Sequence, residues 1–97
     1  MSHLFNQIMM FNIINIKGKK CLDAGCGSGR YSIALARNGA ESVTAIDISK
    51  NGIAEAKKRA VGIPKIQFQQ ASTLDLPFKE SEFDFVLSAG VIHHTPD

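Results

Sequence analysis

Three glycines that alternate with other residues form the part of this chain best suited to chemistry. Gly25, Gly27 and Gly29 lie within residues 22–30, which read LDAGCGSGR and follow a short apolar stretch. Glycines at this spacing let the backbone turn tightly, and they let a ligand touch the main chain where a Cβ atom would block it. The run departs from the dinucleotide pattern G-x-G-x-x-G, because Arg30 stands where that pattern has its last glycine.

An acidic residue, Asp23, lies two positions before the first of these glycines. A carboxylate at this place would repel a pyrophosphate, whereas it would attract an ammonium or a sulfonium group. The glycine run and its acid together predict a ligand that resembles a nucleotide but carries a positive charge at one end.

A second carboxylate, Asp47, closes the next β-branched stretch. It follows the glycines by about twenty residues, where nucleotide-binding α/β folds place the acid that accepts both ribose hydroxyls. The alternative is a structural role at the start of the next helix, beside Ser49. We favour ribose binding, because Asp47 stands in register with the glycine run.

The elements that must position these residues alternate along the chain. The sequence predicts strands at 19–23, 42–46, 65–69 and 83–88, helices at 30–38 and 50–60, a short helix within 2–15 and a loop over 71–82. Ser49 is expected to cap the helix at 50–60. The side chains expected on buried faces are Tyr31, Ala34, Leu35, Ile53, Ala56, Ala60, Ile66 and Phe68. This alternation predicts a parallel sheet with right-handed crossovers.

The last expected strand, at 83–88, carries apolar residues on both faces, as an interior strand of a parallel sheet does. Only nine residues follow it, so we expect no later strand to cover its free edge. A long apolar edge promotes aggregation. We therefore expect the N-terminal part of a larger domain, able to self-associate through this edge. The alternative is that the N-terminal segment or a second chain covers it.

Composition narrows the classes of function. With 97 residues, 44% of them hydrophobic, the chain is expected to be one small globular domain or part of a larger one. The net charge is +2 and the lysines are scattered among acids, so no nucleic-acid partner is indicated. Cys21 and Cys26 lack the spacing of a metal site or a disulfide framework, which favours the reducing cytoplasm. No apolar run reaches the ~20 residues of a membrane span, and no signal peptide is evident.

Four segments, in this order, resemble the class I S-adenosylmethionine-dependent methyltransferases that modify small molecules, quinones or lipids. The matching segments are residues 22–30, 43–47, 75–78 and 83–88, the last continuing through 90–97. The resemblance implies an α/β fold, a Rossmann-like parallel sheet with flanking helices, of which the chain carries the first four strands in the order 3-2-1-4. Residues 1–18 would form an N-terminal segment, and residues 19–97 the N-terminal half of the cofactor-binding domain.

The resemblance also implies a set of residues that bind S-adenosyl-L-methionine. These are Asp23, Gly25, Cys26, Gly27, Gly29, Asp47, Ile48, Ser72, Thr73 and Ala89. Asp23 and the glycine loop would hold the methionine end, and Asp47 would take the ribose hydroxyls. Ile48 would lie against adenine, and Ala89 would border the methyl donor. Ser72 stands where the family places an acid near adenine, so this contact differs here.

The implied reaction is an in-line displacement at a sulfonium methyl, with an unidentified small molecule as the acceptor. Because the protein mainly aligns donor and acceptor, we assign no residue as catalytic and no metal. One of His93 and His94 would face the acceptor, unless they merely precede a helix and have no chemical role.

Two alternatives remain at this stage. The chain could be a cofactor-binding half-domain that is inactive alone. It could also be a fragment of an oxidoreductase that binds a nicotinamide dinucleotide, which Arg30 and Asp23 disfavour.

Overall fold

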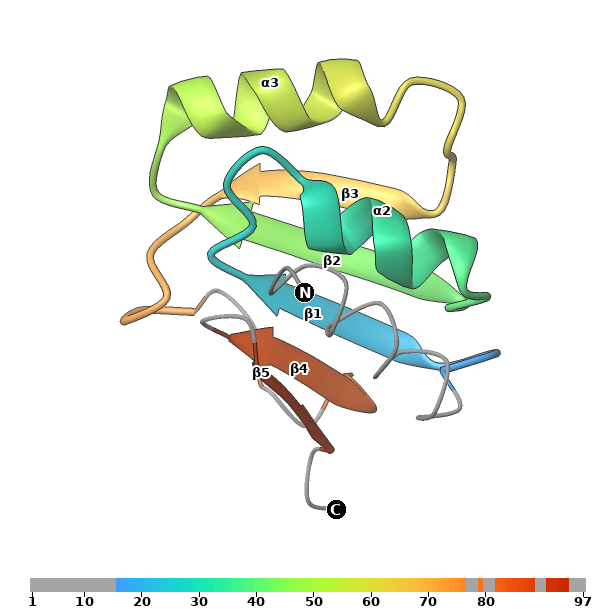
Figure 1. Ribbon diagram of the computed structural model, residues 1–97. Helices are drawn as coiled ribbons and strands as arrows, with labels where there is room; N and C mark the ends of the chain where they lie inside the picture. The colour runs from blue at the N-terminus through green and yellow to red at the C-terminus, as the bar shows by residue number, and fades with distance from the viewer. Residues whose placement is uncertain (1–15, 77–78, 80–81, 89–90, 95–97) are drawn as a thin grey trace, which may run out of the picture.

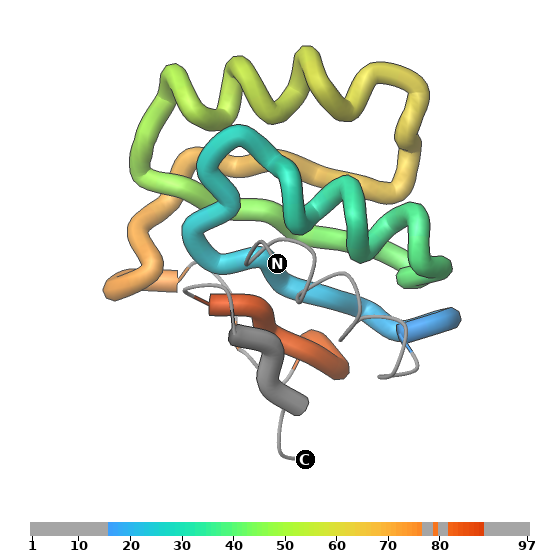
Figure 2. The backbone as a smooth tube through the Cα atoms, viewed as in Figure 1, coloured from blue at the N-terminus to red at the C-terminus, as the bar shows by residue number. Residues whose placement is uncertain are grey.

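A mixed β-sheet with two helices on one face forms the centre of the molecule. The computed structural model describes residues 16–76, 79, 82–88 and 91–94 (Figure 1). The elements are β1 (Lys20–Ala24), α2 (Arg30–Arg37), β2 (Ser42–Asp47), α3 (Lys50–Arg59), β3 (Ile66–Gln70), β4 (Phe85–Ser88) and β5 (Val91–His94). The sheet has five strands in the order β3-β2-β1-β4-β5. In Figure 2 the backbone leaves the sheet through α2 and again through α3 before it returns to the neighbouring strand.

The expected parallel sheet is confirmed for the first four strands. β1 lies between β2 and β4, with Leu22 opposite Thr44 on one side and Val86 on the other, and β3 pairs with the outer side of β2. Because all four strands run in the same direction, their carboxyl ends meet at one edge of the sheet. The glycine loop and Asp47 both lie at this edge.

The boundaries of the elements agree with the sequence to within one or two residues. The Ser49 hydroxyl caps α3 by accepting a hydrogen bond from the backbone N–H of Gly52 at 3.0 Å, as expected. β4 begins two residues later than predicted, after Asp84, whose carboxylate accepts a hydrogen bond from the backbone N–H of Lys20 at 2.8 Å. The helix expected within residues 2–15 lies outside the described residues.

Both helices cover the same face of the sheet. Leu35 of α2 packs with Val43 and Leu87, and Ile53 of α3 packs with Ala45. The other face carries a separate apolar cluster of Leu22, Ile46, Phe83 and Val86. Of the side chains expected on buried faces, Leu35, Ile53, Ala56 and Ala60 are buried, whereas Tyr31, Ala34, Ile66 and Phe68 are half-buried.

One expectation about the last strand is wrong. β5 pairs with β4 in antiparallel fashion, with Ser88 opposite Val91, so a later strand does cover that edge. Two residues separate the strands, which is enough for an antiparallel hairpin although far too short for a parallel crossover. Self-association through an open edge of β4 thereby loses its basis. His93 and His94 lie in a strand and not at a helix entry.

Candidate functional site

The glycine loop between β1 and α2 is fixed to the end of β2. The backbone N–H groups of Gly25 and Cys26 both donate hydrogen bonds to the Ile46 carbonyl, each at 2.8 Å. Gly25 has a φ of 85° and Gly27 a φ of 53°, values that residues with a Cβ atom rarely adopt. The loop therefore exists in this form because glycine occupies these positions.

The three glycines differ in what surrounds them. A Cβ atom built on Gly25 or Gly27 would meet no atom within 4 Å, so both positions face open space. A Cβ atom on Gly29 would lie 2.9 Å from the Cβ of Ala56 in α3. The first two glycines thus leave room beside the backbone for a ligand, whereas the third allows the start of α2 to pack against α3.

Asp47 connects the glycine loop to the start of α3. Its Oδ2 accepts a hydrogen bond from the backbone N–H of Gly27 and its Oδ1 accepts one from the backbone N–H of Ser49, both at 2.8 Å. An ionised carboxylate can accept about four hydrogen bonds, so capacity remains for further donors. The structural and ligand-binding roles weighed for Asp47 are therefore compatible.

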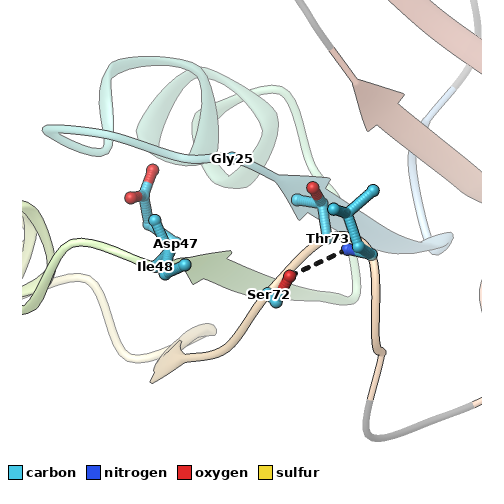
Figure 3. Close-up of a pocket in the computed structure, with 6 residues that line it drawn as sticks. Gly25, Asp47, Ile48, Ser72 and Thr73 are labelled. Carbon is cyan, nitrogen blue, oxygen red and sulfur yellow. Dashed lines mark hydrogen bonds between the residues drawn. The ribbon is translucent and has the colours of Figure 1, made fainter.

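A cavity of about 260 Å³ opens beside Asp47 at the carboxyl ends of β2 and β3. Its lining consists of Gly25, Asp47, Ile48, Ser72, Thr73 and Leu74. In Figure 3, Asp47 and Ile48 lie on one side of the cavity, and Ser72 and Thr73 lie on the other. Ile48 is 71% exposed and Leu74 is 96% exposed. Two exposed apolar side chains beside a carboxylate and two hydroxyls suit a ligand that is planar and apolar in one part and hydroxylated in another.

The loop after β3 is held close to β2. The backbone N–H of Ala71 donates a hydrogen bond to the Asp47 carbonyl at 3.0 Å, and the Gln70 side chain donates one to the Ile48 carbonyl at 3.1 Å. The Ser72 hydroxyl accepts a hydrogen bond from the backbone N–H of Leu74 at 3.1 Å, which folds the loop into a turn (Figure 3). One lone pair and the hydroxyl proton of Ser72 remain for a ligand.

Asp23 occupies a different environment from Asp47. Its side chain is 2% exposed, and its Oδ2 accepts a hydrogen bond from the Ser32 hydroxyl at 2.6 Å. The pKa of this carboxyl group is raised to about 6, chiefly by burial and also by the nearby Asp47 carboxylate, whereas the hydrogen bond from the Ser32 hydroxyl opposes the rise. Asp23 therefore changes its charge close to neutral pH.

Neither cysteine is suited to nucleophilic chemistry. Burial raises the pKa of the Cys26 thiol to about 12, and the Asp23 and Asp47 carboxylates contribute to this shift. Burial and Asp84 raise the pKa of Cys21 to about 12 as well. Both side chains remain protonated thiols at neutral pH. Within the described residues, no three His, Cys, Asp or Glu side chains gather into a possible metal site.

The structure brings part of the expected site together in one cavity. Gly25, Asp47, Ile48, Ser72 and Thr73 line it. Asp23, Cys26, Gly27 and Gly29 belong to β1 and the adjoining loop but do not line this cavity. Ala89 lies outside the described residues.

Sequence analysis missed two residues of this region. Leu74 lines the cavity, and its signal was weak, because it is one of several apolar residues in the loop over 71–82. Ser32 contacts Asp23, and nothing in the sequence marked it, because this contact depends on how α2 packs over β1.

Comparison with known proteins identifies the family. A family model described as a methyltransferase domain matches residues 22–97. The chain belongs to this methyltransferase family. The resemblance to class I S-adenosylmethionine-dependent methyltransferases is thereby confirmed, and so is the Rossmann-like sheet with strand order 3-2-1-4.

Individual methyltransferases match most of the chain. An uncharacterized methyltransferase of Synechocystis is 35% identical over 89 residues, which cover 92% of this chain and 40% of the relative. A demethylmenaquinone methyltransferase of Staphylococcus aureus is 31% identical over 83 residues, covering 84% of this chain and 34% of the relative. The chain thus spans well under half the length of these relatives.

A solved structure agrees with the fold of this methyltransferase chain. The crystal structure of a proposed S-adenosylmethionine-dependent methyltransferase from Listeria monocytogenes superposes with a TM-score of 0.75 at 26% identity. The superposition covers 87% of this chain and 38% of the Listeria protein. Within the described residues, no helix is long and apolar enough to cross a membrane.

Proposed function

We propose that residues 19–97 bind S-adenosyl-L-methionine at the carboxyl ends of β1, β2 and β3, as the N-terminal half of a domain that methylates a small molecule. The main support is the cavity lined by Asp47, Ile48 and the loop after β3. The glycine loop lies next to it and has open space at Gly25 and Gly27. Each part of this arrangement has a counterpart in the cofactor.

The nucleoside end fits the cavity itself. Asp47 has unused acceptor capacity for the two ribose hydroxyls, because its two present hydrogen bonds use only part of the carboxylate. The exposed Ile48 side chain offers an apolar surface for the adenine ring, and the Ser72 and Thr73 hydroxyls offer hydrogen bonds to its edge. Because Ser72 stands where the family places an acid, the edge of the adenine ring would meet a neutral hydroxyl here.

The methionine end fits the glycine loop. Gly25 and Gly27 expose the backbone to a ligand, and Asp23 places a negative charge beneath them. A positive group above the loop would be attracted to this charge, more strongly than in water because the carboxyl group is buried.

The chemical step needs little from the described side chains. When bound, S-adenosyl-L-methionine supplies a methyl group that is already activated on a sulfonium. The chain would hold donor and acceptor in line, and such positioning can contribute ~7–11 kcal/mol. We assign no catalytic residue.

We propose further that the methyl acceptor is a small molecule. A small-molecule acceptor is supported by the similarity to the Staphylococcus demethylmenaquinone methyltransferase, although the identity is only 31%. His93 and His94 lie on β5, beside β4 in the sheet, and we propose that one of them faces the acceptor.

Calorimetry on the whole chain tests the proposal. We expect S-adenosylhomocysteine to bind and NAD not to bind at the same concentration, because Asp23 disfavours a pyrophosphate and Arg30 replaces the last glycine of the dinucleotide pattern. Tighter binding of NAD would contradict the proposal and favour an oxidoreductase. Incubation with labelled S-adenosylmethionine and a cell extract separates methyl transfer from binding alone, which is the inactive half-domain alternative.

A further inference from the structure

Helix α2 begins without a cap of its own. Its N-cap residue is Gly29, which has no side chain, and its first turn contains no acidic residue. The backbone N–H groups of a first helical turn have no partners within the helix. The acid that contacts this turn is Asp23 of β1, whose Oδ2 accepts a hydrogen bond from the hydroxyl of Ser32, the third residue of α2.

The contact between Ser32 and Asp23 is shut off from water. The Ser32 side chain is fully buried, the Asp23 side chain is 2% exposed, and 2.6 Å separate their oxygens. A hydrogen bond to a charged group in such surroundings is stronger than one between neutral groups. Because both side chains are buried, water cannot take the place of this hydrogen bond when it is lost.

None of the other neighbours named here stabilises the charge of Asp23. From the end of β2, the Asp47 carboxylate repels it, and from the glycine loop the Cys26 thiol contributes no charge because it stays protonated. From β4, Leu87 lies opposite Asp23 in the sheet register and is apolar. Burial and the Asp47 carboxylate favour the neutral form of this carboxyl group, whereas the hydrogen bond from the Ser32 hydroxyl favours the ionised form.

We propose that Ser32 is a positioning residue of the cofactor site, which holds the Asp23 carboxylate beneath the glycine loop in the ionised form that attracts the ligand's positive end. This inference rests on the proposed function. It follows that binding is linked to a proton: where Asp23 is protonated, the arriving ammonium group displaces that proton to solvent. Affinity should then rise with pH until Asp23 is ionised in the free protein, and remain constant above that pH.

The first experiment follows the binding of S-adenosylhomocysteine between pH 5 and 8 by calorimetry. In Ser32→Ala the carboxylate loses one donor, so the pH of half-maximal affinity should move upward by about one unit. The variant should bind several-fold more weakly than the wild type near pH 6.5 and nearly as well at pH 8. Ser32→Thr retains the hydroxyl and should restore the wild-type profile, and Asp23→Asn should remove the pH dependence.

Ser49→Ala is the matched control for loss of helix stability. It removes a second hydroxyl from a helix start, but that hydroxyl bonds to Gly52 and not to Asp23. Its stability should fall while its pH profile stays unchanged. A uniform loss of affinity in Ser32→Ala at every pH would overturn the inference and leave Ser32 a purely structural residue.

A second measurement needs no ligand. The carboxyl carbon of Asp23, followed by NMR in the free protein, should titrate at a higher pH in Ser32→Ala than in the wild type. An unchanged titration would overturn the inference even if the proposed function holds. Failure of the wild type to bind S-adenosylhomocysteine would overturn the proposed function and this inference together.

Discussion

Asp23 and Asp47 lie near the carboxyl ends of neighbouring strands of one sheet, yet their surroundings differ. Asp47 is half-buried, accepts hydrogen bonds from two backbone N–H groups of different loops, and lines the cavity. Asp23 is buried beside the start of α2 and accepts a hydrogen bond from the Ser32 hydroxyl. Under the proposed function, these two carboxylates would serve one ligand in different ways, Asp47 by direct contact and Asp23 by its charge.

The glycine loop between the two acids gives the most severe test. In Gly27→Val, a β-branched side chain would project into the open space beside the loop and would have to adopt a φ of 53°. We expect no detectable binding of S-adenosylhomocysteine in calorimetry and a loss of about 1–2 kcal/mol of stability from the left-handed backbone. Normal binding would place the ligand elsewhere.

Gly29→Ala tests the third glycine of the loop. Its φ is 85°, and its Cβ atom would approach Ala56 to 2.9 Å and not the open space, so this variant should lose stability while its folded fraction still binds. Equal loss of binding in both variants would mean that the loop acts only through the packing of α2 on α3.

Asp47→Ala tests the carboxylate that acts by contact. The variant loses the acceptor for the ribose hydroxyls, and we expect at least a tenfold weaker affinity because each such bond contributes ~1.5–3 kcal/mol. The variant should also be less stable, because the backbone N–H groups of Gly27 and Ser49 lose their acceptor. We expect a stability loss of about 1–3 kcal/mol for each group that remains unsatisfied.

Asp47→Asn separates the two roles of this residue. It retains one acceptor oxygen and nearly the same volume, so it should recover part of the stability and less of the affinity. Chemical denaturation alongside calorimetry measures both. An affinity equal to that of the wild type in both variants would leave Asp47 only its structural role.

The outline of the fold could be predicted because local patterns determine it. Apolar and β-branched stretches marked β1, β2 and β3, and Ser49 marked the start of α3. The strand β5 could not be predicted in the same way. Its pairing with β4 depends on a short connection, and the apolar residues of β4 suit either a parallel or an antiparallel neighbour.

The site shows the same limit of local patterns. Gly25 and Asp47 follow from spacing, because strand ends of a parallel sheet converge at one edge, whereas Ile48 was expected only from the family resemblance. Spacing does not reveal that the glycines have separate roles, since only the packing of α2 against Ala56 distinguishes Gly29. It also does not reveal burial, which gives Asp23 its raised pKa.

Asp23→Asn tests the carboxylate that acts by its charge. The pKa of Asp23 rises from 3.8 to about 6 in the folded protein, so the native state binds a proton more tightly than the unfolded state. The stabilisation from this proton is complete below pH 3.8 and is lost as the pH rises through about 6. An asparagine avoids that loss, so the variant should gain up to roughly 3 kcal/mol over the wild type at pH 7.

Denaturation of wild type and Asp23→Asn at several pH values checks this prediction. The difference in stability should grow between pH 4 and 6 and then stay constant. The variant should bind S-adenosylhomocysteine more weakly at pH 7, although it is more stable. If Asp23→Asn is destabilised equally at pH 4 and pH 7, the carboxyl group contributes as a hydrogen-bond acceptor for α2, and its ionisation does not destabilise the fold.

Ser49→Ala should have the smallest effect of these variants, and it tests how Asp47 is held in place. Ser49 contributes to the site through its backbone N–H, which donates to Asp47, whereas its hydroxyl accepts a hydrogen bond from Gly52 and caps α3. Ser49→Ala retains the first contact and loses the second. We expect a loss of about 1 kcal/mol in denaturation, as for other N-caps, and an affinity for S-adenosylhomocysteine within twofold of the wild type. Asp47 would keep its position because the backbone amide still holds it. A large loss of affinity would mean that the carboxylate is positioned by the helix cap as a whole, and the contrast with Asp23, whose position depends on a serine hydroxyl, would then disappear.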